Sequence, residues 1–389
     1  MAALDPVAAA NAWLARLPES QRLAADAFTH ARLVGWAVGG LVFLALCLVV
    51  ARSGVLTRLR RWVETPERPR PWLVAAVSAG LLAFVLAAVN AAIGAVTAWR
   101  ADLILARGGG APPAASLAAH LAYAASGILP AVFLAALLVP PLLWLIRRLP
   151  RAWPLVAGGV GAAAILALGW LPYALAAGPA PPPAPPGPAQ AGVARLIAET
   201  GLPAHAVLAS PDPSFDADVT GGLGRTRVVV GPRLLAGPPA EARAYVGHLM
   251  GHYVHQDILV VCLVAGGVIL AGCFAAQRLA SPLARAIGGR RVGSPSDPEA
   301  LPALAILGFL TLTVAGLAAS AYLRAANVGA DAYSLDHARE PDGLAAAVER
   351  EWDRQSVDPT PIEAAIFYTH PPLKGRLVHA MAWKAAHGG

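Results

Sequence analysis

Long apolar runs free of charged residues alternate with short arginine-rich segments along most of this chain. A helix needs about 20 apolar residues to cross a bilayer, and each run has about that length. The pattern therefore predicts six membrane-spanning helices, and the adjacent Pro140 and Pro141 are expected to shorten the third. The runs without Asp, Glu, Lys or Arg are 33–51, 73–98, 121–146, 153–178, 258–275 and 301–323.

A more polar segment interrupts the apolar runs after the fourth of them. It follows a proline-rich linker at 179–189, which composition predicts to be extended and semi-rigid. Residues 190–200 have helical periodicity and end before a glycine. Residues 204–209 and 225–231 predict two short strands. A helix is expected over 240–256.

Composition agrees with a membrane protein. The chain is 57% hydrophobic and 14% charged, whereas soluble domains carry about 25% charged residues. The net charge of +7 comes mainly from arginines between the runs, which favours a role in membrane orientation over nucleic-acid binding. By the positive-inside rule, the basic loops 52–72, 147–152 and 276–300 are cytoplasmic and residues 179–256 lie outside.

The stretch "HLMGH" at 248–252 places two histidines four residues apart on one face of the predicted helix. Such a pair is a minimal zinc platform, and in the pattern H-E-x-x-H the glutamate activates the water. Here Leu249 occupies the glutamate position. Read alone, the pair is also typical of solvated or helix-capping histidines. A third ligand is expected from 325–340, where Asn327 and Asp331 have helical spacing.

Five stretches together resemble the membrane zinc metallopeptidases of the type I CAAX prenyl protease family, to which the heat-shock membrane protease is related. Their order and spacing match over nearly the whole chain. The stretches are "ADAFTHARL" (25–33), "GGLGRTRVVV" (221–230), "HLMGHYVHQD" (248–257), "ADAYSL" (330–335) and "FYTHPPLKGRL" (367–377).

The resemblance implies a mainly α-helical, multi-pass transmembrane bundle with an inserted metallopeptidase-like (gluzincin) α+β domain. It also implies zinc as the cofactor. His248 and His252 stand at two ligand positions, Asn327 stands at the third, and Asp331 stands where a carboxylate holds a ligand histidine. The bundle is expected to have one span fewer than the family.

The remaining positions that the resemblance assigns lie at the substrate. His370 and Arg376 stand at positions that stabilise the transition state in the family. The family also faces the metal domain toward the cytoplasm, the opposite of what the charge rule indicates. Both orientations stay open.

Three departures from the family pattern favour a catalytically impaired homologue. Leu249 replaces the general base, Asn327 replaces the ligand glutamate, and "ADVTG" (217–221) replaces the edge strand that holds substrate. General-base catalysis is worth about 10²- to 10⁴-fold. A rearranged site is the alternative, with Asp331, His255 or Asp257 supplying a carboxylate or ligand.

Function therefore stays open between an impaired metallopeptidase homologue, a non-catalytic peptide-binding or protease-partner protein, and an active zinc endopeptidase with a rearranged site. The expected partners are membrane lipid and membrane-associated or lipidated peptides, without nucleic acid, and the expected location is the cell membrane. The predicted organisation is an N-terminal tail (1–32), four spans (33–178), the linker (179–189), a metallopeptidase-like segment (190–257), two spans with a basic loop (258–323) and the C-terminal part of the metallopeptidase domain (324–389).

Overall fold

The computed structural model describes residues 4–109, 115–223, 225–288 and 292–388. Gly224 of the predicted turn and the two arginines at 290–291 of the third basic loop lie outside the described residues. The chain divides into two compact units, one of residues 1–26, 164–265 and 317–389 and the other of residues 27–163 and 266–316. We call these the peptidase unit and the span unit.

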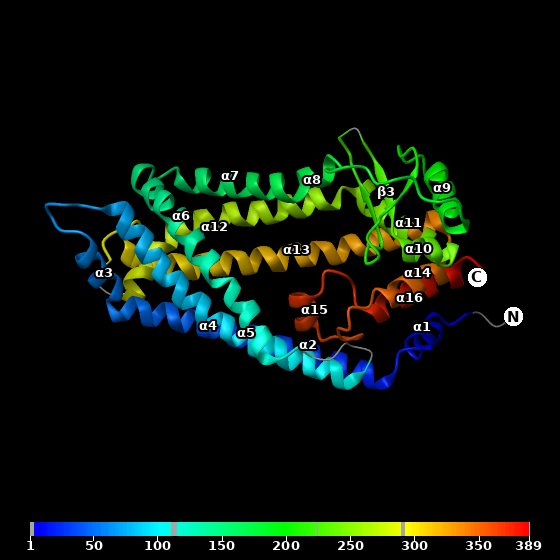
Figure 1. The fold of residues 1–389 in the computed structure, drawn as a ribbon, viewed down its shortest axis with the longest axis horizontal. Coiled ribbons are helices and arrows are strands. Elements are labelled where there is room, and N and C mark those ends of the chain that lie inside the picture. Colours follow the sequence, from blue (N-terminus) through cyan, green and yellow to red (C-terminus); the bar gives the residue numbers. More distant parts are fainter. Residues whose placement is uncertain (1–3, 110–114, 224, 289–291, 389) are drawn as a thin grey trace. The chain divides into compact units, whose positions relative to one another are not determined.

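Six helices are long and apolar enough to cross a membrane, as the apolar runs predicted. All six begin or end in the span unit, where α4 packs against α5 and α6 (Figure 1). The helices that make up these spans are α2 (Glu19–Ser53), α4 (Pro71–Gly108), α5 (Leu117–Ser126) with α6 (Ile128–Arg148), α7 (Trp153–Ile165) continued through a π-helical segment (Leu166–Trp170) into α8 (Leu171–Ala174), α12 (Asp257–Gly288) and α13 (Leu301–Ala338).

The predicted effect of the proline pair is wrong. Pro140 and Pro141 both lie inside α6, which continues to Arg148. The interruption falls instead at Gly127, between α5 and α6. Neighbouring helices can satisfy the carbonyl groups that a proline frees within an apolar bundle, so a proline pair need not end the helix.

The other elements of the span unit lie at the ends of its long helices. The short amphipathic helix α3 (Val55–Val63) connects α2 to α4, and a 3-10 turn (Pro298–Ala300) precedes α13. A buried apolar cluster that includes Leu56, Leu82, Leu143 and Trp153 holds these helices together.

The peptidase unit combines a small sheet with helices from distant parts of the chain. In Figure 1 its sheet is green, and its C-terminal helices are orange to red. The elements outside the spans are α1 (Pro6–Leu14), α9 (Pro188–Thr200), β1 (Val207–Ala209), β2 (Ala217–Thr220), β3 (Arg227–Val230), α10 (Pro232–Ala236), α11 (Pro239–His255), α14 (Pro341–Arg350), α15 (Pro361–Phe367) and α16 (Leu373–Ala386).

The helices predicted for this unit are confirmed. Helix α9 ends at Gly201, whose left-handed backbone (φ 66°) suits glycine. Helix α11 carries the two motif histidines and packs against α9 and α14. Its inner side joins a core that includes Val193, Val228 and Met250.

The sheet has the order β1-β3-β2. Strand β3 pairs in parallel with β1 and antiparallel with β2. The extended linker covers the outer side of β1, because Ala184 donates to the Val207 carbonyl and Ala209 donates to the Pro182 carbonyl. Within the described ranges no strand or bridge pairs with the outer side of β2, so β2 is an open edge strand.

Candidate metal centre and its polar cluster

Two glycines allow α11 and α13 to approach closely enough to bring the motif residues together. A Cβ atom at Gly251 would lie 2.8 Å from the Ala330 Cα, and one at Gly247 would lie 3.1 Å from the Ser334 Oγ. The Ser334 hydroxyl also donates to the Ala244 carbonyl at 2.7 Å. The four-residue spacing of the glycines therefore gives α11 a flat face for α13.

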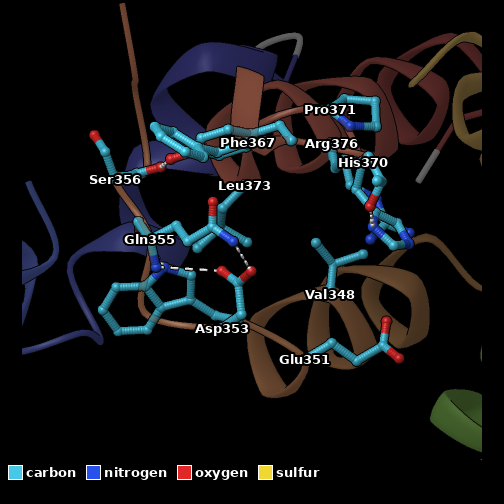
Figure 2. Close-up of a pocket in the computed structure, with 13 residues that line it drawn as sticks. Val348, Glu351, Asp353, Gln355, Ser356, Phe367, His370, Pro371, Leu373 and Arg376 are labelled. Atoms are coloured by element: carbon cyan, nitrogen blue, oxygen red, sulfur yellow. Dashed lines mark hydrogen bonds between the residues drawn. The ribbon is translucent and has the colours of Figure 1, made fainter. Parts of the chain in front are cut away.

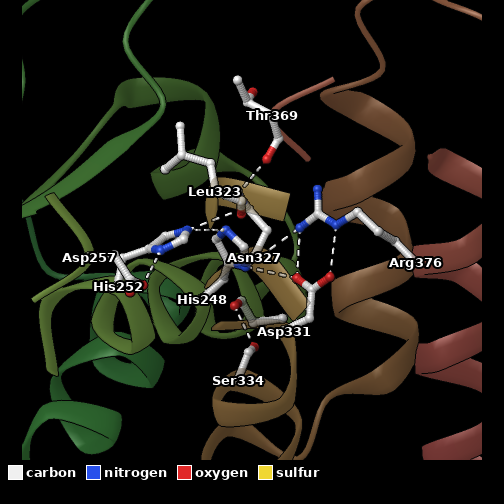
Figure 3. Close-up of polar contacts among 10 residues, drawn as sticks. His248, His252, Asp257, Leu323, Asn327, Asp331, Ser334, Thr369 and Arg376 are labelled. Carbon is white, nitrogen blue, oxygen red and sulfur yellow. Dashed lines mark hydrogen bonds and ion pairs between the residues drawn. The ribbon is translucent and has the colours of Figure 1, made fainter. Parts of the chain in front are cut away.

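The two motif histidines point toward one another and toward Asn327 of α13 (Figure 3). The Nε2 atoms of His248 and His252 are 3.2 Å apart. The Asn327 Oδ1 lies 3.2 Å from the His252 Nε2. The structure thus brings together the three positions that the sequence assigned to metal ligands.

A carboxylate holds the other ring nitrogen of each histidine. Asp331 Oδ1 lies 2.7 Å from the His248 Nδ1, and Asp257 Oδ2 lies 2.8 Å from the His252 Nδ1. Asp257 can reach back to His252 because Gln256, between α11 and α12, adopts a left-handed conformation (φ 56°). Carboxylates that orient ligand histidines in this way are common around metal ions.

Asn327 presents its oxygen to the histidines because its amide nitrogen is used elsewhere. The Nδ2 donates to the Leu323 carbonyl at 2.8 Å and to the Thr369 carbonyl at 3.1 Å. An ionised carboxylate only accepts hydrogen bonds, so His248 and His252 each donate from Nδ1. Three lone-pair-bearing atoms therefore converge on one place, and that place favours a positive charge.

The converging atoms match the spacing of zinc ligands. With zinc–nitrogen bonds of about 2.0–2.1 Å in tetrahedral geometry, neighbouring ligand atoms lie about 3.3 Å apart. The donor set is weaker than in a catalytic site, because it consists of two neutral imidazoles and an amide oxygen. The described part of the chain holds no group of three His, Cys, Asp or Glu that could bind a metal. His248, His252 and Asn327 would hold the ion, which as a Lewis acid polarises a carbonyl group.

Asp331 connects the histidines to the C-terminal helix. It accepts two hydrogen bonds from Arg376 of α16, at 2.8 Å from Nε and 2.7 Å from Nη2. Both side chains are buried, with 1% and 6% of their surfaces exposed. Burial lowers the pKa of His248, and the hydrogen bond that His248 donates to Asp331 opposes this shift only in part. A neutral His248 keeps its Nε2 lone pair available.

Arg376 and His370 both line a cavity of about 280 Å³, which Figure 2 shows with Glu351 on another part of its wall. Among the described residues, the only hydrogen-bond partner of the His370 side chain is the Thr369 hydroxyl, at 3.2 Å. Desolvation and the positive charge of Arg376 lower the pKa of His370 to about 4. The ring is therefore neutral at pH 7, and it is Arg376 that carries the charge.

The other candidate residues of the sequence analysis make different contacts. Leu249 is partly buried and packs against the core of the peptidase unit. His255 is exposed and meets Tyr333 edge to face. Asp257, besides holding His252, accepts a hydrogen bond of 2.6 Å from Tyr322. Asp257 therefore orients His252, and His255 packs against an aromatic ring.

Sequence reasoning missed several members of this cluster. Tyr322 ends an apolar run, and Thr369 contributes only a backbone carbonyl, so neither carries a signal of its own. Ser334 lies in "ADAYSL", but its bond to the Ala244 carbonyl depends on the approach of two helices. A rearranged site would use Asp257 as a carboxylate or ligand, whereas in the structure it accepts a hydrogen bond from His252.

The model of peptidase family M48 matches residues 185–384, just over half of the chain. Among solved structures, the crystal structure of S. mikatae Ste24p is 14% identical, with a TM-score of 0.46, over 93% of this chain and 98% of that chain. No curated protein matches.

Proposed function

The chain belongs to peptidase family M48, and on this premise we propose that it is a catalytically silent membrane metallopeptidase homologue. In this proposal it retains a zinc site of reduced affinity at His248, His252 and Asn327. It binds membrane-associated peptides, including lipidated ones, in the cell membrane without hydrolysing them.

The observation that carries the proposal is the convergence of three hydrogen-bond acceptors on one place. The His252 Nε2 lies 3.2 Å from the His248 Nε2 and 3.2 Å from the Asn327 Oδ1. Carboxylates fix the proton of each ring on Nδ1, so this arrangement is stable only with a positive charge among the acceptors. A zinc ion supplies that charge at the spacing of its usual ligands.

The loss of hydrolysis follows from what surrounds that place. Leu249 cannot accept a proton, and it packs into the apolar core rather than toward a water. Losing the general base costs about 10²- to 10⁴-fold in rate. Replacing a ligand glutamate by Asn327 removes a negative charge from the metal and weakens its binding beyond the roughly 10- to 100-fold that more distant changes cause.

The open edge of β2 supports peptide binding. An extended peptide can add a strand to an exposed sheet edge through backbone hydrogen bonds. The strand packs against α11, which carries both histidines. Its Val219 side chain is buried in the core, so the strand is held in place without a partner on its outer side. Peptide binding at this edge does not require hydrolysis.

Zinc stoichiometry tests the metal part of the proposal. The full chain, purified in detergent and incubated with micromolar zinc, is expected to retain close to one zinc per chain by elemental analysis. His248→Ala is expected to retain none. Absence of zinc from the parent protein would refute a metal site.

Peptide cleavage tests the catalytic part separately. The zinc-loaded protein is expected to bind a lipidated reporter peptide without cleaving it. Substituting Ala217, in β2, with proline is expected to weaken peptide binding while leaving zinc bound. Cleavage that is lost in His248→Ala would instead establish an active endopeptidase with a rearranged site.

A further inference from the structure

The span unit contains a second cavity, of about 760 Å³, where several of its helices end. Helix α3 lines it with residues three and four positions apart, which share one face. The other walls are formed by the start of α4 (Pro71 and Val74), the end of α6 (Arg147) and the segment ahead of α13 (Asp297, Pro298 and Glu299). The α3 residues that line the cavity are Thr57, Arg60 and Arg61, and Glu64 follows just after the end of this helix.

Among the described residues, two arginines of this cavity form no ion pair with a carboxylate. Arg60 pairs with Glu64 at 2.7 Å. Arg61 takes part in no hydrogen bond or ion pair with any described residue, and Arg147 donates only to the Ser296 carbonyl, at 2.7 Å. Two guanidinium groups that line the same cavity suit a phosphate, which can accept hydrogen bonds from both.

One carboxylate of the cavity also lacks a hydrogen-bond donor. Glu64 and Asp297 accept hydrogen bonds from backbone N–H groups nearby. The Glu299 side chain is only 8% exposed, and its Oε2 has no hydrogen-bond partner among the described residues. Its nearest cation is Arg60, at 3.7 Å. A buried carboxylate oxygen of this kind requires a donor, and a charged N–H group suits it best.

The cavity lies where a bilayer headgroup would be. Helix α3 is amphipathic, with Leu56 buried in the core and Trp62 83% exposed. Trp72, at the beginning of the span helix α4, is 51% exposed. Exposed tryptophans on a basic amphipathic helix next to the end of a span are typical of the membrane interface. The occupant is therefore expected to come from the lipid.

We propose that this cavity binds the headgroup of phosphatidylethanolamine. The phosphate is held by Arg61 and Arg147, and the primary ammonium donates to Glu299. Three arginines and three carboxylates line the cavity, so its charge is balanced and matches a headgroup that carries both signs. Phosphatidylcholine lacks the N–H donors, and phosphatidylglycerol lacks the cation.

Nanodiscs that contain the full chain test the choice of headgroup. The discs are made of phosphatidylcholine alone, or with a minor fraction of phosphatidylethanolamine or phosphatidylglycerol. We expect phosphatidylethanolamine to raise the unfolding temperature and to remain bound in native mass spectrometry, with an affinity at least about tenfold above that of phosphatidylcholine. Equal or better retention of phosphatidylglycerol would overturn the proposal.

Three variants assign the contacts. Arg61→Gln combined with Arg147→Gln is expected to abolish retention of phosphatidylethanolamine. Glu299→Gln is expected to remove the preference over phosphatidylcholine while some phospholipid stays bound, which also shows that the variant folds. Arg58→Gln is the matched control, because this arginine lies on α3 outside the cavity lining and bonds the Ser53 carbonyl.

The remaining outcomes concern the source of the ligand. If Arg58→Gln reduces retention as strongly as the cavity pair, a diffuse basic surface binds the lipid and the site is refuted. If soluble phosphoethanolamine or inorganic phosphate displaces the lipid at low concentration, the cavity binds a free phosphate compound and the lipid assignment is wrong. Resistance to both competitors supports it.

Discussion

The Nε2 atoms of His248 and His252 face each other at 3.2 Å, although a carboxylate holds the Nδ1 side of each ring. Two neutral imidazoles in this arrangement direct lone pairs at one another. A cation between them removes the repulsion. The polar cluster is therefore suited to a positive charge, and Leu249 and Asn327 occupy the positions that the family resemblance assigns to a base and a ligand.

Restoring the two replaced residues is expected to restore chemistry. In Leu249→Glu combined with Asn327→Glu, the carboxylates supply a base and an anionic ligand at the positions the family resemblance assigns. We expect zinc affinity to rise by more than about tenfold and cleavage of a reporter peptide to appear, by up to about 10²- to 10⁴-fold over the parent. Zinc competition and cleavage assays measure the two effects.

The matched control for this gain is Leu249→Gln combined with Asn327→Gln, which has similar volume without the charges. It is expected to show neither tighter zinc binding nor cleavage. If the glutamate variant binds one zinc tightly and still cleaves nothing, the substrate-binding parts of the site are altered as well. The residues at 249 and 327 would then not account for the absence of peptide cleavage.

The buried pair of Asp331 and Arg376 is expected to dominate the stability of the cluster. Replacing Arg376 by glutamine leaves the Asp331 charge nine-tenths buried with one partner fewer, and breaking such a pair costs about 3–5 kcal/mol. Asp331→Asn also releases His248. The double variant is expected to be less destabilised than the two single changes added together, because they remove the same interaction.

Unfolding measurements on the two single variants and the double variant give the coupling. The control is Lys374→Gln, which removes an exposed pair with Asp358 of similar length, 2.6 Å. An exposed pair contributes about 0–1 kcal/mol. An additive result for Asp331 and Arg376, or an equal loss in the control, would contradict a dominant buried pair.

Glu351 is expected to make stability depend on pH. Burial raises its pKa, against the hydrogen bond from Tyr245 and the charge of Arg376. A carboxyl group whose pKa is raised on folding is favourable below its unfolded pKa, and this contribution is lost as pH rises through the folded value. Glu351→Gln is therefore expected to stabilise the protein at pH 7 and to lose that advantage near pH 4.

Unfolding temperatures of parent and variant across this pH range test the sign. Replacing the exposed Glu19 with glutamine serves as the control and is expected to change little at any pH. A variant that is less stable than the parent at neutral pH would mean that the Glu351 charge stabilises the fold through Arg376 or Arg350.

Some of this architecture could be predicted because it depends on patterns along the chain. The six spans follow from length and apolarity, and the pairing of His248 with His252 follows from helical spacing. Strand β2 carried no strand signal of its own, because it is four residues long and includes Asp218 and Thr220. Its place was known only through the resemblance.

The hydrogen bonds of the cluster depend instead on how elements meet. Asp257 reaches His252 only because one left-handed residue, Gln256, reverses the chain after α11. The role of Asn327 as an acceptor depends on the carbonyls that occupy its amide nitrogen. Neither contact can be predicted from residue spacing, because each depends on how the elements pack together.

Gly251 lies between the two histidines, where α11 has less space against α13 than at Gly247. Its missing side chain would place a Cβ 2.8 Å from the Ala330 Cα and 3.1 Å from the Tyr333 Cβ. Gly251→Ala is expected to force α11 away from α13 and to cost about 1–3 kcal/mol. Because Asn327 lies on α13, the displacement also separates it from His252, so zinc retention is expected to fall together with the unfolding temperature.

A glycine-to-alanine substitution at Gly375 is expected to change stability in the opposite direction. Gly375, in α16, has no atom within 4 Å of the position where a Cβ would be placed, so Gly375→Ala is expected to stabilise the helix by about 0.5–1 kcal/mol. Measuring both variants separates the effect of backbone freedom from that of the helix contact. If Gly251→Ala retained zinc and stability, the close approach of α11 and α13 would not be what assembles the metal centre.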